Sequence, residues 1–154
     1  MAIFWWVLNV LVLASAAVSI FWQSQITIRA KYNYWSLGYG VVFGVLLTTN
    51  VINDWSYIVF TAAFILINII SGVGGLTPER IITNGIFYAT AVRFTDLQTI
   101  TLTQQPLPGN RIRIIAIFKT KRNRRISLVF TQTMETLLTQ LRKVIPNDVA
   151  VEVR

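Results

Sequence analysis

The chain has 154 residues, of which 54% are hydrophobic and 13% are charged, and its formal net charge is +8 at pH 7. Soluble domains carry about 25% charged residues, so this composition favours a membrane protein. The chain contains no cysteine and no histidine. Disulfides, cysteine-based zinc sites, cysteine nucleophiles and histidine-dependent catalysis are therefore excluded.

Charge is distributed unevenly along the chain. Residues 1–76 contain Arg29, Lys31 and Asp54 as their only charged residues, so the other 12 of the 14 basic and 5 of the 6 acidic residues lie in residues 77–154. A step of this size indicates two physical environments on one chain. We expect transmembrane helices in residues 1–76 and a cytoplasmic domain in residues 77–154.

The first apolar segment, Ile3–Trp22, has the roughly 20 residues that a spanning helix needs. The small residues Ala14-Ser15-Ala16 resemble a signal-peptide cleavage site, which gives an alternative interpretation. No lysine or arginine precedes the apolar segment, however, and a signal peptide normally has a basic start. We therefore favour a retained helix.

Two further apolar segments follow, Trp35–Val51 and Trp55–Ser71. Each is near the lower limit of about 17–25 residues for a spanning helix. Because residues 52–54 are too few to return across a bilayer, we expect a tight helical hairpin, with a single re-entrant hairpin as the alternative. All five tryptophans lie near the ends of the three expected helices, which is typical of the headgroup layer. The pattern predicts three transmembrane helices.

The orientation follows from the basic residues. Arg29 and Lys31 lie between the first two expected helices, and Asp54 lies between the second and third. Basic loops are retained in the cytoplasm. This rule predicts a multi-pass protein of the cell membrane with its N-terminus outside and its C-terminal domain in the cytoplasm.

Four residues within the apolar segments are candidates for helix packing. Gly40 and Gly44 form a GxxxG pattern, which allows close approach of helix backbones within the hairpin or between copies. The pattern is also found in membrane helices that merely tolerate glycine. Asn9 and Asn68 place amides in an apolar setting, so we expect them to form hydrogen bonds between helices. No acidic or basic residue lies within an expected span, which argues against an ion-coupled transporter.

The C-terminal half changes to the alternation of apolar and polar residues that is typical of strands. Residues 105–110, with two prolines and a glycine, are expected to form a loop. A helix should follow from Met134 to Ile145, started by Thr131 or Thr133 and stopped by Pro146. The expected strands are Arg80–Thr83, Gly85–Phe94, Asp96–Thr103, Arg111–Lys121 and Arg124–Phe130.

This half resembles the bacterial PH-like domains that directly follow membrane helices. The resemblance lies in the segments Leu76–Ile86 and Val92–Leu97, in the strand hairpin 111–130 and in the helix after it, and it covers residues 57–146. Where the family commonly has an aromatic-x-Asp-Ile element, this chain has Phe94-Thr95-Asp96-Leu97. The resemblance implies an α+β membrane protein, with three transmembrane helices followed by a PH-like, partly open antiparallel β-barrel and a C-terminal helix. It implies a fold rather than a function.

A cluster of basic residues is the sharpest candidate site. Anionic lipids attract such residues at about 1 kcal/mol each. The cluster could bind anionic lipid or an acidic partner surface, or it could be solvated positive-inside charge. Nucleic-acid binding is the least favoured interpretation, because no aromatic residues are interleaved for base stacking. The cluster consists of Lys119, Lys121, Arg122, Arg124 and Arg125.

No pattern of catalytic residues is present. The five acidic residues beyond residue 77 all have ordinary structural positions, and there is no phosphate-binding loop or metal-ligand motif. We expect no enzymatic activity, no cofactor and no metal. The sequence favours a non-catalytic accessory, scaffolding or regulatory subunit that contacts membrane lipids and another membrane protein or a second copy. The alternatives are a lipid-handling protein, or a homo-oligomeric channel or transporter that uses Thr48, Thr49, Asn50, Asn68 and the GxxxG face.

Overall fold

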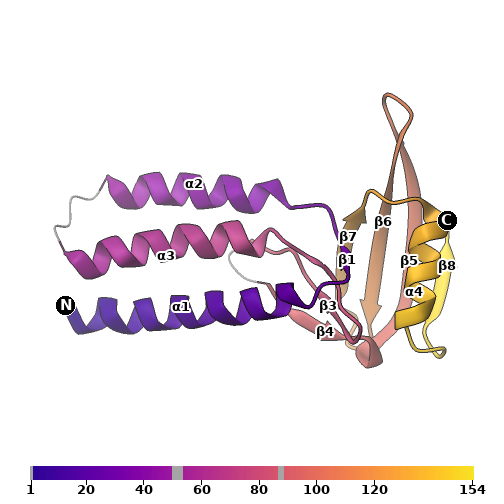
Figure 1. Ribbon diagram of the computed structural model, residues 1–154, viewed down its shortest axis with the longest axis horizontal. Helices are drawn as coiled ribbons and strands as arrows, with labels where there is room; N and C mark the ends of the chain where they lie inside the picture. Colours follow the sequence, from indigo (N-terminus) through magenta and orange to yellow (C-terminus); the bar gives the residue numbers. More distant parts are fainter. Residues whose placement is uncertain (1, 50–53, 87–88) are drawn as a thin grey trace.

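The computed structural model describes residues 2–49, 54–86 and 89–154 (Figure 1). In these residues the protein is α+β, with four α-helices and two four-stranded sheets. Three apolar helices lie side by side at one end of the molecule, and both sheets and the fourth helix lie at the other end (Figure 1).

The helical end consists of α1 (Ala2–Ser24), α2 (Tyr34–Thr48) and α3 (Trp55–Ser71). Helix α3 packs against both α1 and α2. The side chain of Asn33 caps the start of α2, and that of Asp54 caps the start of α3. Among the described helices, α1 alone is long and apolar enough to cross a membrane.

The prediction of three transmembrane helices is therefore wrong. At about 1.5 Å per residue, the 23 residues of α1 extend about 34 Å, more than the roughly 30 Å of a hydrocarbon core. The 15 residues of α2 and the 17 of α3 extend about 22 Å and 25 Å. The predicted end of the second span, residues 50–51, lies outside the described residues, as do residues 52 and 53 of the predicted connection.

Most buried side chains of the helical end are small or polar, with Tyr57 and Ile67 of α3 as the large exceptions. The buried residues of α2 are Ser36, Gly40 and Gly44. Large apolar residues face outward instead, with Trp35 and Trp55 more than 70% exposed. Small residues at helix contacts and apolar residues on the outer faces are typical of helices packed in lipid.

A first sheet connects the helices to the rest of the chain. Its order is β1 (Ile28–Arg29), β2 (Gly75–Leu76), β3 (Arg80–Ile82) and β4 (Ala91–Arg93), all antiparallel. Strand β1 comes from the connection between α1 and α2, so the first sheet contains backbone from both halves of the chain. Among the described residues of the predicted strand Gly85–Phe94, Ala91–Arg93 are extended in the sheet, and residues 87 and 88 lie outside the description.

The second sheet contains the long hairpins. Strands β5 (Leu97–Leu107), β6 (Arg111–Thr120) and β7 (Arg125–Phe130) are antiparallel neighbours. The 3-10 helix η1 (Phe94–Asp96) precedes β5. Strand β5 extends to Leu107, so half of the loop expected at residues 105–110 is strand. The turn that remains contains Gly109 and Asn110 at positive φ.

The chain continues into α4 (Met134–Val144) and then into β8 (Ala150–Val153), which pairs parallel with β5. The cap of α4 is Thr133, one of the two residues, Thr131 and Thr133, predicted to start this helix. The expected architecture, an antiparallel barrel that ends in a helix, differs from this arrangement. The alternation of Val149, Val151 and Val153 after Pro146 continues the chain as a strand, and the described strands divide into two sheets.

One apolar core lies between the two sheets and α4. The outer face of α4 is polar, and its buried residues, Leu137 and Leu141, face the core. Ile28 of β1 and Leu76 of β2 belong to the same core as the second sheet. The core further contains Ile81, Phe94, Leu97, Ile100, Leu102, Ile114, Ala116, Phe118, Ile126, Leu128, Phe130, Ile145 and Val149.

Candidate functional site: a basic turn and its cavity

The basic cluster lies at the turn between β6 and β7. The backbone N–H of Thr120 donates to the carbonyl of Arg124 at 2.9 Å, and the Thr120 hydroxyl oxygen accepts from the N–H of Arg124 at 3.0 Å. Asn123 takes the left-handed conformation, with φ of 61°, which asparagine tolerates better than most residues. These bonds close the turn. The side chains of Lys121, Arg122 and Arg124 are left exposed.

The structure separates the five basic residues into two groups. Lys121, Arg122 and Arg124 line a cavity of about 450 Å³ together with Ala91, Val92, Asp96 and Thr120. Lys119 and Arg125 do not line it and instead face each other across β6 and β7. Like charges directly opposite on neighbouring strands are destabilising. This pair of like charges therefore lowers the stability of the β6–β7 hairpin relative to a neutral pair.

The cavity lies beside the first sheet, because Ala91 and Val92 of β4 line it. The N–H of Lys121 donates to the Asp96 carbonyl at 2.8 Å, and the Arg124 guanidinium lies 3.4 Å from the Thr90 hydroxyl oxygen. Among the described residues, none of the five basic side chains forms an ion pair. Three cations thus surround the cavity, with the Asp96 carboxyl group as the single acid in its lining. Such a cavity attracts an anionic group, because its three cations outnumber its one carboxyl group.

The two predicted packing glycines lie against α3. A Cβ atom added at Gly40 would be 2.9 Å from the Asn68 Cβ, and one added at Gly44 would be 2.7 Å from the Ile65 Cδ1. Nothing lies within 4 Å of the corresponding point at Gly38. Gly40 and Gly44 therefore pack against α3 within the hairpin, which is one of the interpretations of the GxxxG pattern.

The two predicted amides bond differently. Asn9 in α1 donates to the Ser56 carbonyl in α3 at 2.8 Å, which is a bond between helices. Asn68 instead donates to Phe64 of its own helix at 2.9 Å. Thr48 and Thr49, considered for a channel, donate to carbonyls of α2, and Asn50 lies outside the described residues.

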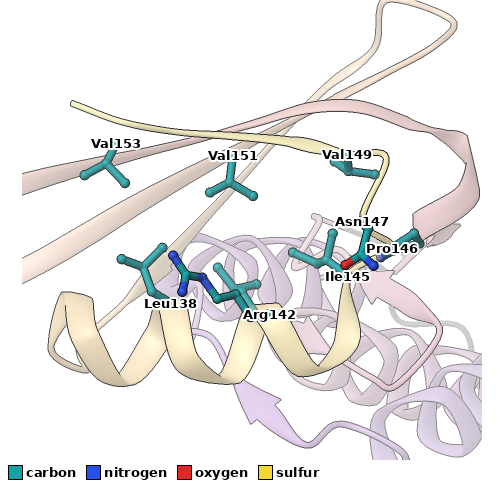
Figure 2. A pocket seen from close by; sticks show the side chains of 9 residues that line it. Leu138, Arg142, Ile145, Pro146, Asn147, Val149, Val151 and Val153 are labelled. Atoms are coloured by element: carbon teal, nitrogen blue, oxygen red, sulfur yellow. The ribbon is translucent and has the colours of Figure 1, made fainter.

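A second cavity was not predicted from the sequence. It has a volume of about 390 Å³ and lies between α4 and β8 (Figure 2). The signal that could have revealed it is the alternation of Val149, Val151 and Val153, which predicts a strand beside the helix. The described residues contain no group of three or more acidic side chains placed to hold a metal ion.

Comparisons with protein-family models, with curated proteins and with solved structures each found no match to this chain. Nothing therefore identifies a PH-like family, and the resemblance of residues 57–146 stays a prediction. The function has to be argued from the geometry of the chain itself.

Proposed function

We propose that this chain is a non-catalytic, membrane-anchored accessory or regulatory protein whose basic turn binds anionic lipid headgroups of its own membrane. The observation that carries the proposal is the cavity of about 450 Å³ lined by Lys121, Arg122 and Arg124. Phosphate groups of lipids are the anions that a protein beside a membrane meets at the highest local concentration. Arginine suits them especially, because its guanidinium can donate two parallel hydrogen bonds to phosphate.

Anchoring is supported by the helical end. Helix α1 has the length and composition of a membrane-crossing helix. Lipid contact with the outer faces of α2 and α3 would explain their exposed apolar side chains, including Trp35 at 74% and Val41 at 54%. A bundle with this outer surface would aggregate in water.

The position of the basic turn suits contact with the same membrane. The first sheet lies between the helices and the second sheet (Figure 1). Arg124 of the turn is 3.4 Å from Thr90, next to β4, and Ala91 and Val92 of β4 line the same cavity as the turn. At the helix ends, Arg29 and Lys31 are exposed in the connection between α1 and α2. Basic residues there favour a cytoplasmic sheet domain and an N-terminus on the opposite side.

The test uses the full chain in nanodiscs. Because the chain has no cysteine, the substitution Ser127→Cys at an exposed position of β7 provides a unique thiol for a fluorophore. The discs contain phosphatidylcholine alone or mixed with phosphatidylglycerol, and a quencher is attached to the lipid headgroups. We expect stronger quenching in the anionic discs. Added salt should reduce the difference, since the Debye length falls from about 10 Å at 0.1 M to about 3 Å at 1 M.

Two charge-matched variants distinguish a site from general charge. Replacing Lys121, Arg122 and Arg124 with glutamine should remove up to about 3 kcal/mol of attraction, roughly a hundredfold in binding. Replacing Arg111, Arg113 and Lys143, which do not line the cavity, should leave the quenching nearly unchanged. Equal losses in both variants would indicate solvated charge without a site. Unchanged quenching in the cavity variant would refute lipid binding by the turn.

A further inference from the structure

Strand β8 is an unprotected edge of the second sheet. The strand order is β7-β6-β5-β8, so β5 is the only described neighbour of β8. The N–H of Arg154 donates to Leu102 of β5 at 2.8 Å. Since N–H groups along a strand alternate in direction, those of Val151 and Val153 point to the free edge. An open edge of this kind can pair with another extended chain.

The apolar face of β8 is left partly uncovered. Val151 and Val153 lie in register with Ile100 and Leu102 of β5, both 0% exposed on the core face of the sheet. Val151 is nevertheless 40% exposed and Val153 is 55% exposed. Helix α4 covers β5 but does not close over β8. The second cavity, of about 390 Å³, is therefore a groove between α4 and β8. In Figure 2, Val151 and Val153 point from β8 toward α4, and Leu138 points from α4 toward β8.

The groove carries a single charged side chain. Arg142 points from α4 toward β8 (Figure 2) and is the one charged residue in the lining. Among the described residues it forms no ion pair. Glu152 is on the opposite face of β8, because residues alternate along a strand, and its carboxylate is 3.3 Å from Arg154. An apolar groove with one unpaired guanidinium fits a ligand that combines apolar side chains with a carboxylate.

The location of the groove argues for a soluble partner. Helix α4 and β8 lie at the end of the molecule opposite the apolar helices (Figure 1). A bilayer around α1 would therefore be far from the groove. A second copy of this chain fits less well, because its own β8 directs Glu152 away from the groove face and its α4 would bring further basic residues, Arg142 and Lys143, to the contact.

We propose that β8 and the groove beside α4 bind an extended, acidic segment of a partner protein. The segment adds to the free edge of β8 through backbone hydrogen bonds. Its apolar side chains fill the groove between Leu138 and Val153, and a carboxylate meets Arg142. This interaction goes beyond lipid binding and is independent of it, because the two sites lie on different elements.

The experiment measures peptide binding to the full chain in neutral detergent. The substitution Ala150→Cys places a fluorophore on β8, on the face opposite the groove. The probes are two short synthetic peptides of alternating valine and serine, in which one valine of the groove-facing set is replaced by glutamate in the first and by lysine in the second. We expect saturable changes in fluorescence with the first peptide and none with the second. Absence of binding by the glutamate peptide, or equal binding of both peptides, would overturn the proposal.

Three variants test the parts of the site. Arg142→Gln should weaken binding about tenfold to a hundredfold, the usual range for a hydrogen bond to a charged group. Its neighbour Lys143→Gln should bind as the parent does. Val153→Pro removes an N–H that faces the free edge, a change that edge strands tolerate. This variant should abolish peptide binding, whereas Val153→Ala, which keeps the N–H, should not.

Two controls separate the remaining outcomes. Sedimentation of the parent and of Val153→Pro should show the same molar mass, and a dimer lost in the proline variant would identify a second copy as the occupant instead. Headgroup quenching in nanodiscs should be unchanged by Arg142→Gln. A failure of the peptide site and a failure of the lipid site are thus observed separately.

Discussion

The ring of Tyr32 lies directly on the backbone of Gly72. A Cβ atom added at residue 72 would be 2.5 Å from the Tyr32 Cζ. The Tyr32 hydroxyl also donates to the Ile69 carbonyl at 2.8 Å. The connection between α1 and α2 is thereby attached to the end of α3, next to the first sheet.

The variant Gly72→Ala should therefore destabilise the fold by about 1–3 kcal/mol, because the ring has to move away from its position. The measurement is thermal unfolding of the full chain in detergent, followed by circular dichroism. Tyr32→Ala removes the opposing ring. In the double variant, the added loss from Gly72→Ala should nearly vanish. Additive losses would show that the two residues do not interact.

Stability should also depend on pH through Tyr32. Burial, and then the nearby Tyr34, raise the pKa of Tyr32 above its ordinary value of 10.0. The neutral phenol is therefore favoured in the folded state. Its stabilising contribution is complete below pH 10 and is lost as the pH rises through the folded pKa. In denaturation series at increasing alkaline pH, Tyr32→Phe should lose less stability than the parent, and parallel curves would contradict this.

Gly40 and Gly38 provide a matched pair on α2. Gly40→Ala would place its Cβ 2.9 Å from the Asn68 Cβ, so α2 and α3 would have to separate, at a cost of about 1–3 kcal/mol. Gly38→Ala meets nothing within 4 Å and should stabilise α2 by about 0.5–1 kcal/mol through its helix propensity. The melting temperatures in one detergent should shift in opposite directions. Shifts of the same sign would mean that the hairpin packs differently.

Leu141 and Leu138 should differ in the same way on α4. Leu141 is 1% exposed in the core, and Leu141→Ala should cost about 2–5 kcal/mol. Leu138 is half-buried and lines the groove, so Leu138→Ala should cost about 1 kcal/mol or less. Chemical denaturation of the full chain measures both values. Equal costs would indicate that α4 covers the core with a different face.

The proposed orientation can be tested in cells with a reporter that is active only in the cytoplasm. Arg29 and Lys31, in the exposed connection after α1, should keep that end of α1 in the cytoplasm. A fusion after Arg154 should then be active, and a fusion before Met1 should be inactive. Replacing Arg29 and Lys31 with glutamine should reduce the difference, and an active N-terminal fusion in the parent would reverse the orientation.

Local patterns were sufficient for the elements that depend on local periodicity. The alternation in Arg111–Thr120 and the apolar stripe of Met134–Val144 each predict the element that the structure contains. The cap at Thr133 and the turn between Lys121 and Arg124 also follow from residues close in sequence. Side-chain direction repeats every two residues in a strand and every 3.6 in a helix, so these elements can be recognised within one segment.

The sequence by itself determined that the chain has an apolar half, a basic half, a long first helix and a cluster of five cations. The tertiary structure alone decided the lengths of α2 and α3, the addition of β1 to the first sheet and the parallel pairing of β8 with β5. It also decided which three cations line the cavity at the basic turn. Among the described residues, it leaves Arg142 without an ion pair beside the groove between α4 and β8. The physical reason is that these features depend on contacts between residues 34 to 51 positions apart in the sequence. Composition and periodicity describe what a segment prefers, whereas only the packed chain determines which partner it meets.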